Sequence, residues 1–339
     1  MPNYNVDVKE NLLKMGNDHA THNEKTLAEI FDLSGKNAIV TGGTTGMGYA
    51  VANRLAEAGA SVVIVGRSAV KGENAESEFR ARGMEVTYCQ ADLTEVEECE
   101  KVVKFTEEKY GPVDILVNNA ARWIFSAYVD TEQWQFDETF NLNVRGVYFM
   151  GQFAARSMIE NQRVGKIVNI ASSSYIANDL ANLGLMTTYE ASKGAVVSLT
   201  MGMAKELKQY GINVNCVAPG SMDTYGNEYP SFGMEDYFDI DGFAEVLSAQ
   251  TGAGGMPYAS PDAPALMVFA LCTDLCNWAY GETIKAAGGR HLSHQVIPLS
   301  TKIDCLEEPE DYTPPRHIRD KSEGSVSWGV KVFYPDAEE

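Results

Sequence analysis

Apolar residues in this chain gather into short continuous runs, and between the runs they recur at every third or fourth position. The runs lie at 38–41, 61–65, 86–90, 114–118, 166–170, 212–217 and 282–286. The intervening stretches, such as 49–59, 102–110 and 144–160, have the spacing of amphipathic helices. Continuous apolar strands that alternate with helices predict a parallel sheet covered on both faces. We therefore expect an α/β fold with a doubly wound, seven-stranded parallel sheet.

Composition and charge narrow the class of protein. The chain has 339 residues, 45% of them hydrophobic, which is typical of a globular protein. Its 47 acidic and 27 basic residues give a net charge of −20, which argues against nucleic acid or an anionic membrane surface as partner. The N-terminus is polar rather than a signal peptide, and no apolar run approaches the roughly 18 residues of a membrane span.

The six cysteines indicate a reduced, intracellular protein. They are scattered and form no Cys-x-x-Cys pair, so we expect core packing rather than disulfides or a metal site. The histidine pairs 19/22 and 291/294 have no cysteine cluster beside them, and no metal is expected. We predict a cytoplasmic location.

Two motifs carry the candidate chemistry. Tyr189 and Lys193 are four residues apart, so on a helix a phenol and an ammonium share one face. A free tyrosine has a pKa of about 10, and a neighbouring ammonium lowers it toward the working range of an acid or base. Upstream, the glycine-bearing segment 41–48 follows the first strand and opens the first helix. This strand, turn and helix are the context of a Rossmann-type dinucleotide-binding loop.

With these residues the chain resembles the short-chain dehydrogenase/reductase family over residues 34–295, a length that fits one domain. Further motifs of that family follow in order: Asp92-Leu93, Asn118-Asn119-Ala120-Ala121, Asn143-Val144-Arg145-Gly146, Asn169-Ile170-Ala171-Ser172, and Pro219-Gly220 with Thr224. Three features depart from the family pattern, and one is that Ala286-Ala287-Gly288-Gly289 lacks the aspartate usual before its glycine pair. Ala121 replaces the usual glycine, and a longer loop separates Ser172 from Tyr189, which leaves the adjoining Ser173 and Ser174 as alternatives for the catalytic serine.

The resemblance implies a division of catalytic roles. Tyr189 would be the general acid in reduction and the general base in oxidation, and Lys193 would assist it and bind the nicotinamide ribose. Ser172 would hold the substrate oxygen, and Asn143 would anchor a water that relays protons to Lys193. Taken singly, such an asparagine is a packing residue and such a serine a helix cap, so the prediction depends on all four together.

The resemblance also implies NAD(H) or NADP(H) as cofactor. The expected cofactor-binding residues are Gly42, Thr44, Thr45, Gly46, Met47, Gly48, Gly66, Arg67, Asp92, Leu93, Asn119, Ala120, Tyr189, Lys193, Pro219, Gly220, Met222 and Thr224. Gly66 stands where NAD-selective members carry an acid, and Arg67 could pair with a 2′-phosphate. The glycine loop has Thr44 and Thr45 instead of a second basic residue, and an arginine can equally stack on adenine. The choice of cofactor stays open.

The segment 222–256 occupies the position of the family's substrate lid. It is rich in aromatic residues and methionine, and Trp123 follows the Asn-Asn-Ala-Ala motif. Such a lid suits a large apolar substrate, and with the resemblance to bacterial 20β-hydroxysteroid dehydrogenases it leads us to expect a hydroxysteroid. A lid that buries only itself, or contacts another subunit, is the alternative. Within enzymes the rival is a sugar or polyol dehydrogenase. Outside enzymes it is a non-catalytic protein that senses the cofactor.

Two extensions flank the predicted domain. Residues 1–33 carry apolar residues at helical spacing, and residues 296–339 are acidic and contain prolines, with a strand-like stretch at 326–334. Apolar segments need a surface to pack on. We expect the extensions to contact a neighbouring subunit, in a self-associated dimer or tetramer.

Overall fold

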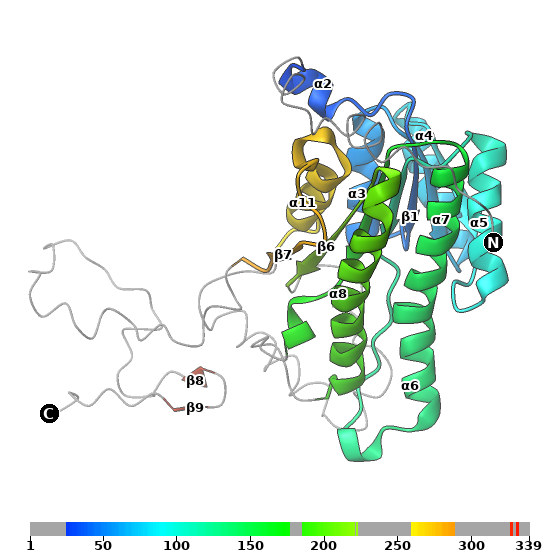
Figure 1. Cartoon of the computed structure of the whole chain (residues 1–339). Helices are drawn as coiled ribbons and strands as arrows, with labels where there is room; N and C mark the ends of the chain where they lie inside the picture. The colour runs from blue at the N-terminus through cyan, green and yellow to red at the C-terminus, as the bar shows by residue number, and fades with distance from the viewer. Residues whose placement is uncertain are drawn as a thin grey trace, which may run out of the picture.

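A seven-stranded sheet forms the centre of the computed structural model, which describes residues 25–176, 185–220, 222 and 259–288 and the backbone at 326–327 and 330–331 (Figure 1). The strands are β1 (Asn37–Thr41), β2 (Ser61–Gly66), β3 (Val86–Gln90), β4 (Ile115–Asn118), β5 (Gly165–Ile170), β6 (Ile212–Pro219) and β7 (Thr283–Ala286). Every neighbouring pair is parallel and the order is β3-β2-β1-β4-β5-β6-β7. The predicted α/β, doubly wound, Rossmann-like fold is confirmed.

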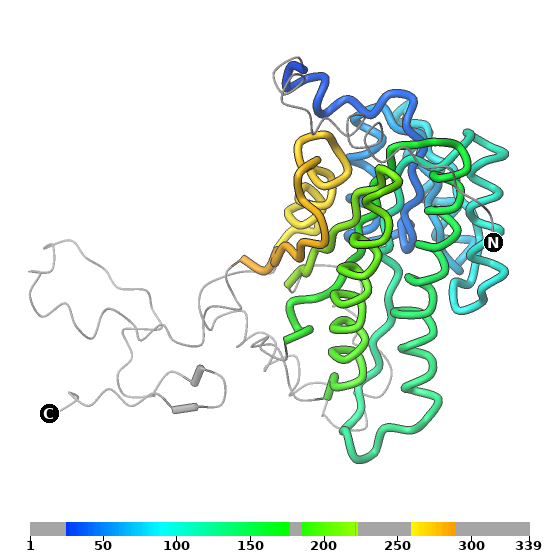
Figure 2. Tube along the Cα trace, in the orientation of Figure 1, coloured from blue at the N-terminus to red at the C-terminus, as the bar shows by residue number. Residues whose placement is uncertain are grey.

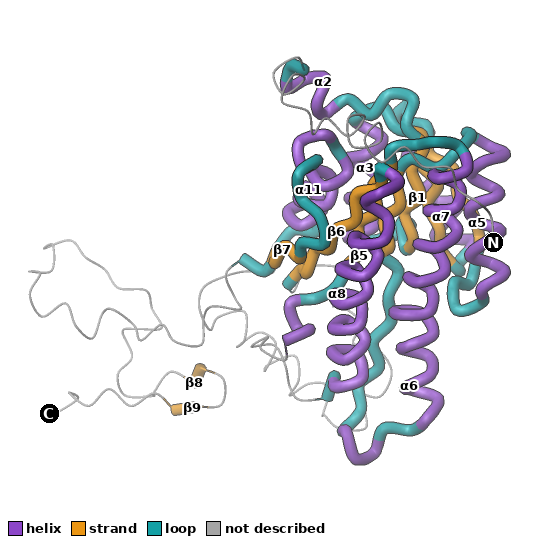
Figure 3. The backbone as a smooth tube through the Cα atoms, viewed as in Figure 1, coloured by secondary structure: helices purple, strands orange, loops and turns teal. Residues whose placement is uncertain are grey.

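Helices cover both faces of the sheet, as continuous apolar strands require (Figure 3). The longer ones are α3 (Gly46–Glu57), α4 (Ala69–Ala81), α5 (Val96–Lys109), α6 (Gln133–Phe140), α7 (Val147–Glu160), α8 (Thr187–Leu207) and α11 (Asp262–Cys272). One core joins α3, α4 and α11 to one face, and Ala38 and Val40 of β1 point into it. The other core joins α5, α7 and α8 to the opposite face, where Ile39 points.

The turn between α6 and α7 departs from the expected continuous helix. Residues Asn141–Gly146 form a π-helical turn, η2, so α7 begins at Val147 instead of near residue 144. A π-helical turn is wider than an α-helical one and is often found at functional sites. Within this turn lies Asn143, which is fully buried.

Buried asparagines fix α8 on the sheet. The Asn118 side-chain amide of β4 donates to Asn169 Oδ1 of β5 at 2.9 Å, and Asn169 Nδ2 donates to the Thr200 hydroxyl of α8 at 3.0 Å. Buried polar groups need such partners, because each unmade hydrogen bond costs about 1–3 kcal/mol. These bonds therefore set the position of the helix that carries Tyr189 and Lys193.

The described end of the N-terminal extension packs on its own chain. Helix α2 (Leu27–Phe31) is capped by Thr26, and the Phe31 ring stacks on Phe269 of α11 with 6.0 Å between centroids. Lys25 pairs with Asp274 in the 3₁₀ turn η5 (Asp274–Cys276) that follows α11. Residues 1–24 lie outside the described residues, so the predicted contact of the extension with a neighbouring subunit stays a prediction.

The chain can be followed along its course in Figure 2 from α2 to β7. In the C-terminal extension the strand-like stretch forms β8 (Val326–Ser327) and β9 (Val330–Lys331), which pair antiparallel. Within the described part of the chain, no helix combines the length and the apolarity needed to cross a bilayer.

Candidate functional site

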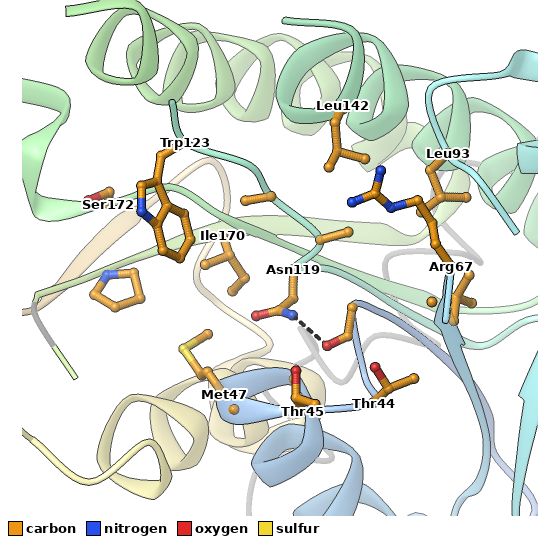
Figure 4. Close-up of a pocket in the computed structure, with 18 of the residues that line it drawn as sticks. Thr44, Thr45, Met47, Arg67, Leu93, Asn119, Trp123, Leu142, Ile170 and Ser172 are labelled. Carbon is orange, nitrogen blue, oxygen red and sulfur yellow. Dashed lines mark hydrogen bonds between the residues drawn. The ribbon is translucent and has the colours of Figure 1, made fainter. Parts of the chain in front are cut away.

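A cavity of about 420 Å³ opens at the carboxyl ends of the parallel strands (Figure 4). In a doubly wound sheet this edge is where ligands bind, and the strand order reverses here between β1 and β4. The predicted residues that line the cavity are Gly42, Thr44, Thr45, Gly46, Met47, Gly48, Gly66, Arg67, Leu93, Asn119, Ala120, Ser172, Tyr189, Lys193, Pro219, Gly220 and Met222. The glycine turn and the catalytic helix α8 therefore share one cavity.

The glycine turn has the geometry of an anion cradle. Gly42 and Gly46 have φ of 63° and 56°, in the left-handed region that favours glycine. A Cβ on Gly48 would lie 2.1 Å from the Gly42 carbonyl oxygen, so this approach of helix to turn excludes every other residue. Asn119 holds the turn by donating to the Thr41 and Gly42 carbonyls at 2.9 and 3.2 Å. No side chain caps the N-terminus of α3, whose backbone N–H groups remain available to a phosphate.

The charges around the cavity favour an anionic ligand. Arg67, Lys71 and Lys193 line it, and no aspartate or glutamate is among the described residues that do. This local balance opposes that of the whole chain, whose net charge is −20. The glycine cradle, the free helix terminus and the three cations together fit the pyrophosphate and ribose groups of a dinucleotide.

Helix α8 presents Tyr189 and Lys193 to the cavity on one face. The Lys193 ammonium lies 5.6 Å from the centroid of the Tyr189 ring, and it donates to the Ile170 carbonyl oxygen at 2.7 Å. Burial lowers the pKa of Lys193 to about 8, because a charged ammonium is costly away from water. At neutral pH the ammonium still predominates. Its charge favours the phenolate form of Tyr189.

Of the three consecutive serines, Ser172 faces the cavity. Its neighbours Ser173 and Ser174 are buried and do not line it. The Ser174 hydroxyl donates to Ser172 Oγ at 2.8 Å, which leaves the Ser172 proton free to point at a ligand. The geometry therefore favours Ser172 over the two alternatives. The Trp123 ring lies edge-on to the Tyr189 ring, with 6.2 Å between ring centroids.

Asn143 lies behind the cavity rather than on its wall. Its amide nitrogen donates to the Arg122 carbonyl at 2.8 Å and to Ser192 Oγ at 3.0 Å, and its oxygen accepts from the Arg122 N–H at 2.8 Å. The Ser192 hydroxyl in turn donates to the Tyr189 carbonyl at 2.6 Å. Both amide hydrogens of Asn143 are thus engaged with protein. Its side chain therefore holds the loop at Arg122 against α8. Because no amide hydrogen is left over, a water bound by Asn143 must donate a hydrogen bond to an oxygen atom of that residue.

Some predicted residues lie outside the main cavity. Asp92 belongs to an adjoining hollow of about 400 Å³ that shares Arg67 and Ala91 with the cavity. Its Oδ1 accepts from the Thr94 N–H and hydroxyl at 3.1 and 2.9 Å. Thr224 and the lid, apart from Met222, lie outside the described residues. No group of three metal-ligating side chains occurs within the part of the chain that the structure describes.

Sequence reasoning missed two residues with clear roles in the site. Lys71, in the first turn of α4, supplies the second cation that the glycine loop lacks. Its spacing of four residues from Arg67 was a signal in the sequence. Ser192, inside the Tyr189–Lys193 motif, joins Asn143 to α8. No pattern identified it, because its role depends on a contact between distant segments.

Comparisons with known proteins show which family the chain is similar to. A family model described as short chain dehydrogenase matches residues 36–230. Gluconate 5-dehydrogenase of Gluconobacter oxydans is 39% identical over 58% of this chain and 75% of its own length. The 2-dehydro-3-deoxy-D-gluconate 5-dehydrogenase of Dickeya dadantii is 33% identical over 78% of this chain and 98% of its own.

A third relative and one solved structure have names that refer to other kinds of molecule than sugar acids. A subunit of (2S)-[(R)-hydroxy(phenyl)methyl]succinyl-CoA dehydrogenase of Thauera aromatica is 36% identical over 75% of this chain and 96% of its own. The structure of an actinorhodin polyketide ketoreductase with NADPH superposes with a TM-score of 0.67. It is 28% identical and covers 76% of this chain and 97% of its own.

Proposed function

The chain belongs to the short-chain dehydrogenase family, and from this premise we propose that it interconverts a secondary alcohol and a ketone on a sugar acid, with NADP(H) preferred. It is an NAD(P)(H)-dependent oxidoreductase with a Rossmann-like fold. One observation carries the proposal for the site. A single cavity joins the glycine turn, at its cofactor end, to Ser172, Tyr189 and Lys193.

The side chains divide the work around the reacting carbon. The bound nicotinamide supplies or accepts the hydride. Tyr189 Oη gives a proton to the ketone oxygen in reduction and takes one from the hydroxyl in oxidation. Ser172 Oγ donates a hydrogen bond to the same oxygen and stabilises the charge that develops on it. The Lys193 ammonium favours the phenolate from 5.6 Å away, and the clamp made by Asn143 and Ser192 holds α8 in place.

A sugar acid is the substrate class best supported. Two of the relatives are named for gluconate or a dehydro-deoxygluconate, and a third is named a 5-keto-D-gluconate reductase. The expected hydroxysteroid receives no support from these relatives. The aromatic lid that suggested it lies outside the described residues.

The test is a substrate panel followed by nicotinamide absorbance with each cofactor. It contains gluconate, 5-keto-D-gluconate, an uncharged hexitol, a hydroxysteroid and a 3-hydroxyacyl-CoA. We expect the highest kcat/KM for a sugar acid, with the hexitol weaker because it lacks the carboxylate. A preference for the steroid or the CoA ester would overturn the substrate class. Cofactor binding without turnover of any member would support the alternative of a cofactor sensor.

The preference for NADP(H) is drawn from the residues at the end of β2. Gly66 supplies no carboxylate for a ribose diol, and Arg67, Ser68 and Lys71 follow it along the cavity wall. Figure 4 shows Arg67 extended between Leu93 and Leu142, at the end of the cavity away from Ser172. Two cations placed there suit a 2′-phosphate better than a bare hydroxyl.

Arg67→Ala is expected to weaken NADPH binding by about 10- to 100-fold, because a charge-assisted pair contributes roughly 1–3 kcal/mol. NADH affinity should change by about threefold or less, since the uncharged ribose makes no such pair. Calorimetric titration of both cofactors measures the difference. Lys101→Ala is the matched control, since Lys101 borders only the adjoining hollow and pairs with Glu98 at 2.8 Å. Equal losses for NADPH and NADH would make NAD(H) the preferred cofactor.

Self-association is proposed from exposed aromatic residues on adjacent helices. Trp134 and Phe136 of α6 and Tyr148 of α7 are about half exposed, and Phe136 stacks on Phe140. Exposed aromatic side chains commonly mark a protein contact. A symmetric dimer that pairs this surface with its own copy would bury it.

A further inference from the structure

Gly146 is the last residue of the π-helical turn η2. The structure leaves no space for a side chain at this position. Its φ and ψ of −58° and −46° are those of an ordinary helix, which any residue adopts. A glycine in a helix costs about 1 kcal/mol relative to alanine, so conformational freedom does not explain it. A Cβ at this position would lie 2.8 Å from the Leu93 carbonyl oxygen. That neighbour is backbone and has no side-chain freedom with which to move away.

The Leu93 carbonyl is held from a second side. The Cys99 thiol donates to it at 3.7 Å, and burial raises the pKa of Cys99 to about 12, so the thiol keeps its proton. The segment before it is also fixed. The Ala91 N–H donates to the Gly66 carbonyl at 3.2 Å. The loop after β3 therefore has little freedom where it meets Gly146.

This loop forms a wall of the cofactor cavity. Ala91 and Leu93 line the cavity at the end where Arg67 lies, and Leu142 of η2 stands opposite (Figure 4). In the proposed function this end takes the adenosine half of the cofactor. A ligand seated there would border Leu93, whose carbonyl oxygen lies close to Gly146.

The other side of the same turn reaches the catalytic helix. Three residues before Gly146, the Asn143 amide binds both Ser192 of α8 and the backbone of Arg122. One short turn thus contacts the adenosine wall at one end and the clamp behind Tyr189 at the other. Asn143, Gly146, Leu93 and Ser192 are all buried, so a shift at one end has no void to absorb it.

We propose that Gly146 is a positioning residue that transmits occupancy of the adenosine end of the cavity, through the Leu93 carbonyl, to the turn that holds Asn143. The coupling depends on how closely the two backbones approach, since a Cβ on residue 146 would lie only 2.8 Å from the Leu93 carbonyl oxygen. The adenosine half of the cofactor then does more than add affinity. It sets the position of Asn143 behind the reacting group. The inference rests on the proposed function, which places adenosine at this end.

The decisive measurement uses wild-type protein, adenosine monophosphate and no substrate. Backbone hydrogen exchange is followed by mass spectrometry at 91–94, the adenosine wall, and at 141–146, the π-helical turn. We expect the nucleotide to slow exchange at both segments, by about fivefold or more at the turn, which corresponds to the lower end of measured couplings between sites. Protection at 91–94 without protection at 141–146 would overturn the inference and leave the proposed function intact. Absence of binding of both adenosine monophosphate and NADPH would overturn both.

Substitutions then assign the effect to the contact. Gly146→Ala should remove the nucleotide-dependent protection at 141–146 and lower kcat by about tenfold or more, because small displacements at a reacting centre are costly. KM for the alcohol should change little. Gly202→Ala is the matched control, a helical glycine of α8 with open space around it, and it should retain protection and kcat.

A second variant tests the same contact in case Gly146→Ala does not fold. Cys99→Ala removes one of the two groups that hold the Leu93 carbonyl and introduces no clash. It should reduce protection at 141–146 while affinity for adenosine monophosphate changes by about threefold or less. Full protection at the turn in both Cys99→Ala and Gly146→Ala would overturn the role of the Leu93 contact.

Discussion

Replacement of Tyr189 by phenylalanine is expected to lower kcat by about 10²–10⁴-fold, the usual contribution of a positioned general acid or base. The phenol supplies the proton, whereas the affinity for a dinucleotide comes mainly from contacts with its phosphates and riboses. The dissociation constant for the cofactor should therefore stay within about threefold of wild type. Steady-state kinetics with the best substrate of the panel and calorimetric cofactor titration measure the two quantities.

A matched control separates this role from general damage. Tyr175 lies in the 3₁₀ turn after Ser172, outside the cavity wall, with Lys285 positioned 5.8 Å from its ring centroid. Tyr175→Phe should keep most of the activity. Substantial turnover in Tyr189→Phe would show that another group transfers the proton, and the assignment of Tyr189 would be wrong.

Removing the charge of Lys193 should stabilise the protein while abolishing its activity. Burial lowers the pKa of both Lys193 and Lys166 to about 8, yet the two lysines lie at opposite ends of β5 and its neighbours. Each charged ammonium costs folding free energy at neutral pH, on the order of 3 kcal/mol for shifts of this size. Lys193→Met and Lys166→Met should both raise the free energy of unfolding at pH 7. Only Lys193→Met should lose turnover.

The pH dependence follows from the sign of the shift. Each lysine is easier to deprotonate in the folded protein than in the unfolded chain, whose value is near 10.5. Between pH 8 and 10.5 the unfolded chain binds more protons, so the wild type gains stability as pH rises through this window. The advantage of the methionine variants should be full below pH 8 and shrink toward pH 10.5. Urea unfolding at pH 7 and pH 9.5 tests it, and an advantage that does not change with pH would show that burial of the ammonium charge is not its cause.

Much of the fold could be predicted because its strands are buried on both faces. Such strands consist of continuous apolar runs in the sequence. The predicted runs agree with the observed strands to within a few residues at each end. The glycine turn was equally visible, because the approach of Gly48 to the Gly42 carbonyl allows no other residue. These signals are local in sequence, and periodicity and residue size reveal them directly.

Features that depend on distant contacts could not be predicted in this way. The π-helical turn at 141–146 has the composition of a helix, and its widening arises from packing between the loop after β3 and α8. The clamp of Asn143 on the Arg122 backbone joins atoms 21 residues apart, and that on Ser192 joins atoms 49 residues apart. The substrate was the weakest prediction, because it depended on the composition of the segment 222–256, of which only Met222 is described.

The contrast between the acid-rich chain and the described part of the cavity wall, which carries cations and no carboxylate, also affects how quickly a cofactor arrives. A dinucleotide that approaches from solution first meets the repulsive field of a molecule with net charge −20, and is attracted by Arg67 and Lys71 only when it is close to the cavity that they line. Added salt screens the long-range repulsion first, since the Debye length is about 8 Å at physiological ionic strength. Added salt is therefore expected to raise the association rate of the cofactor and to lower its affinity for the protein. An enzyme of this kind exchanges its cofactor most freely where ions are plentiful.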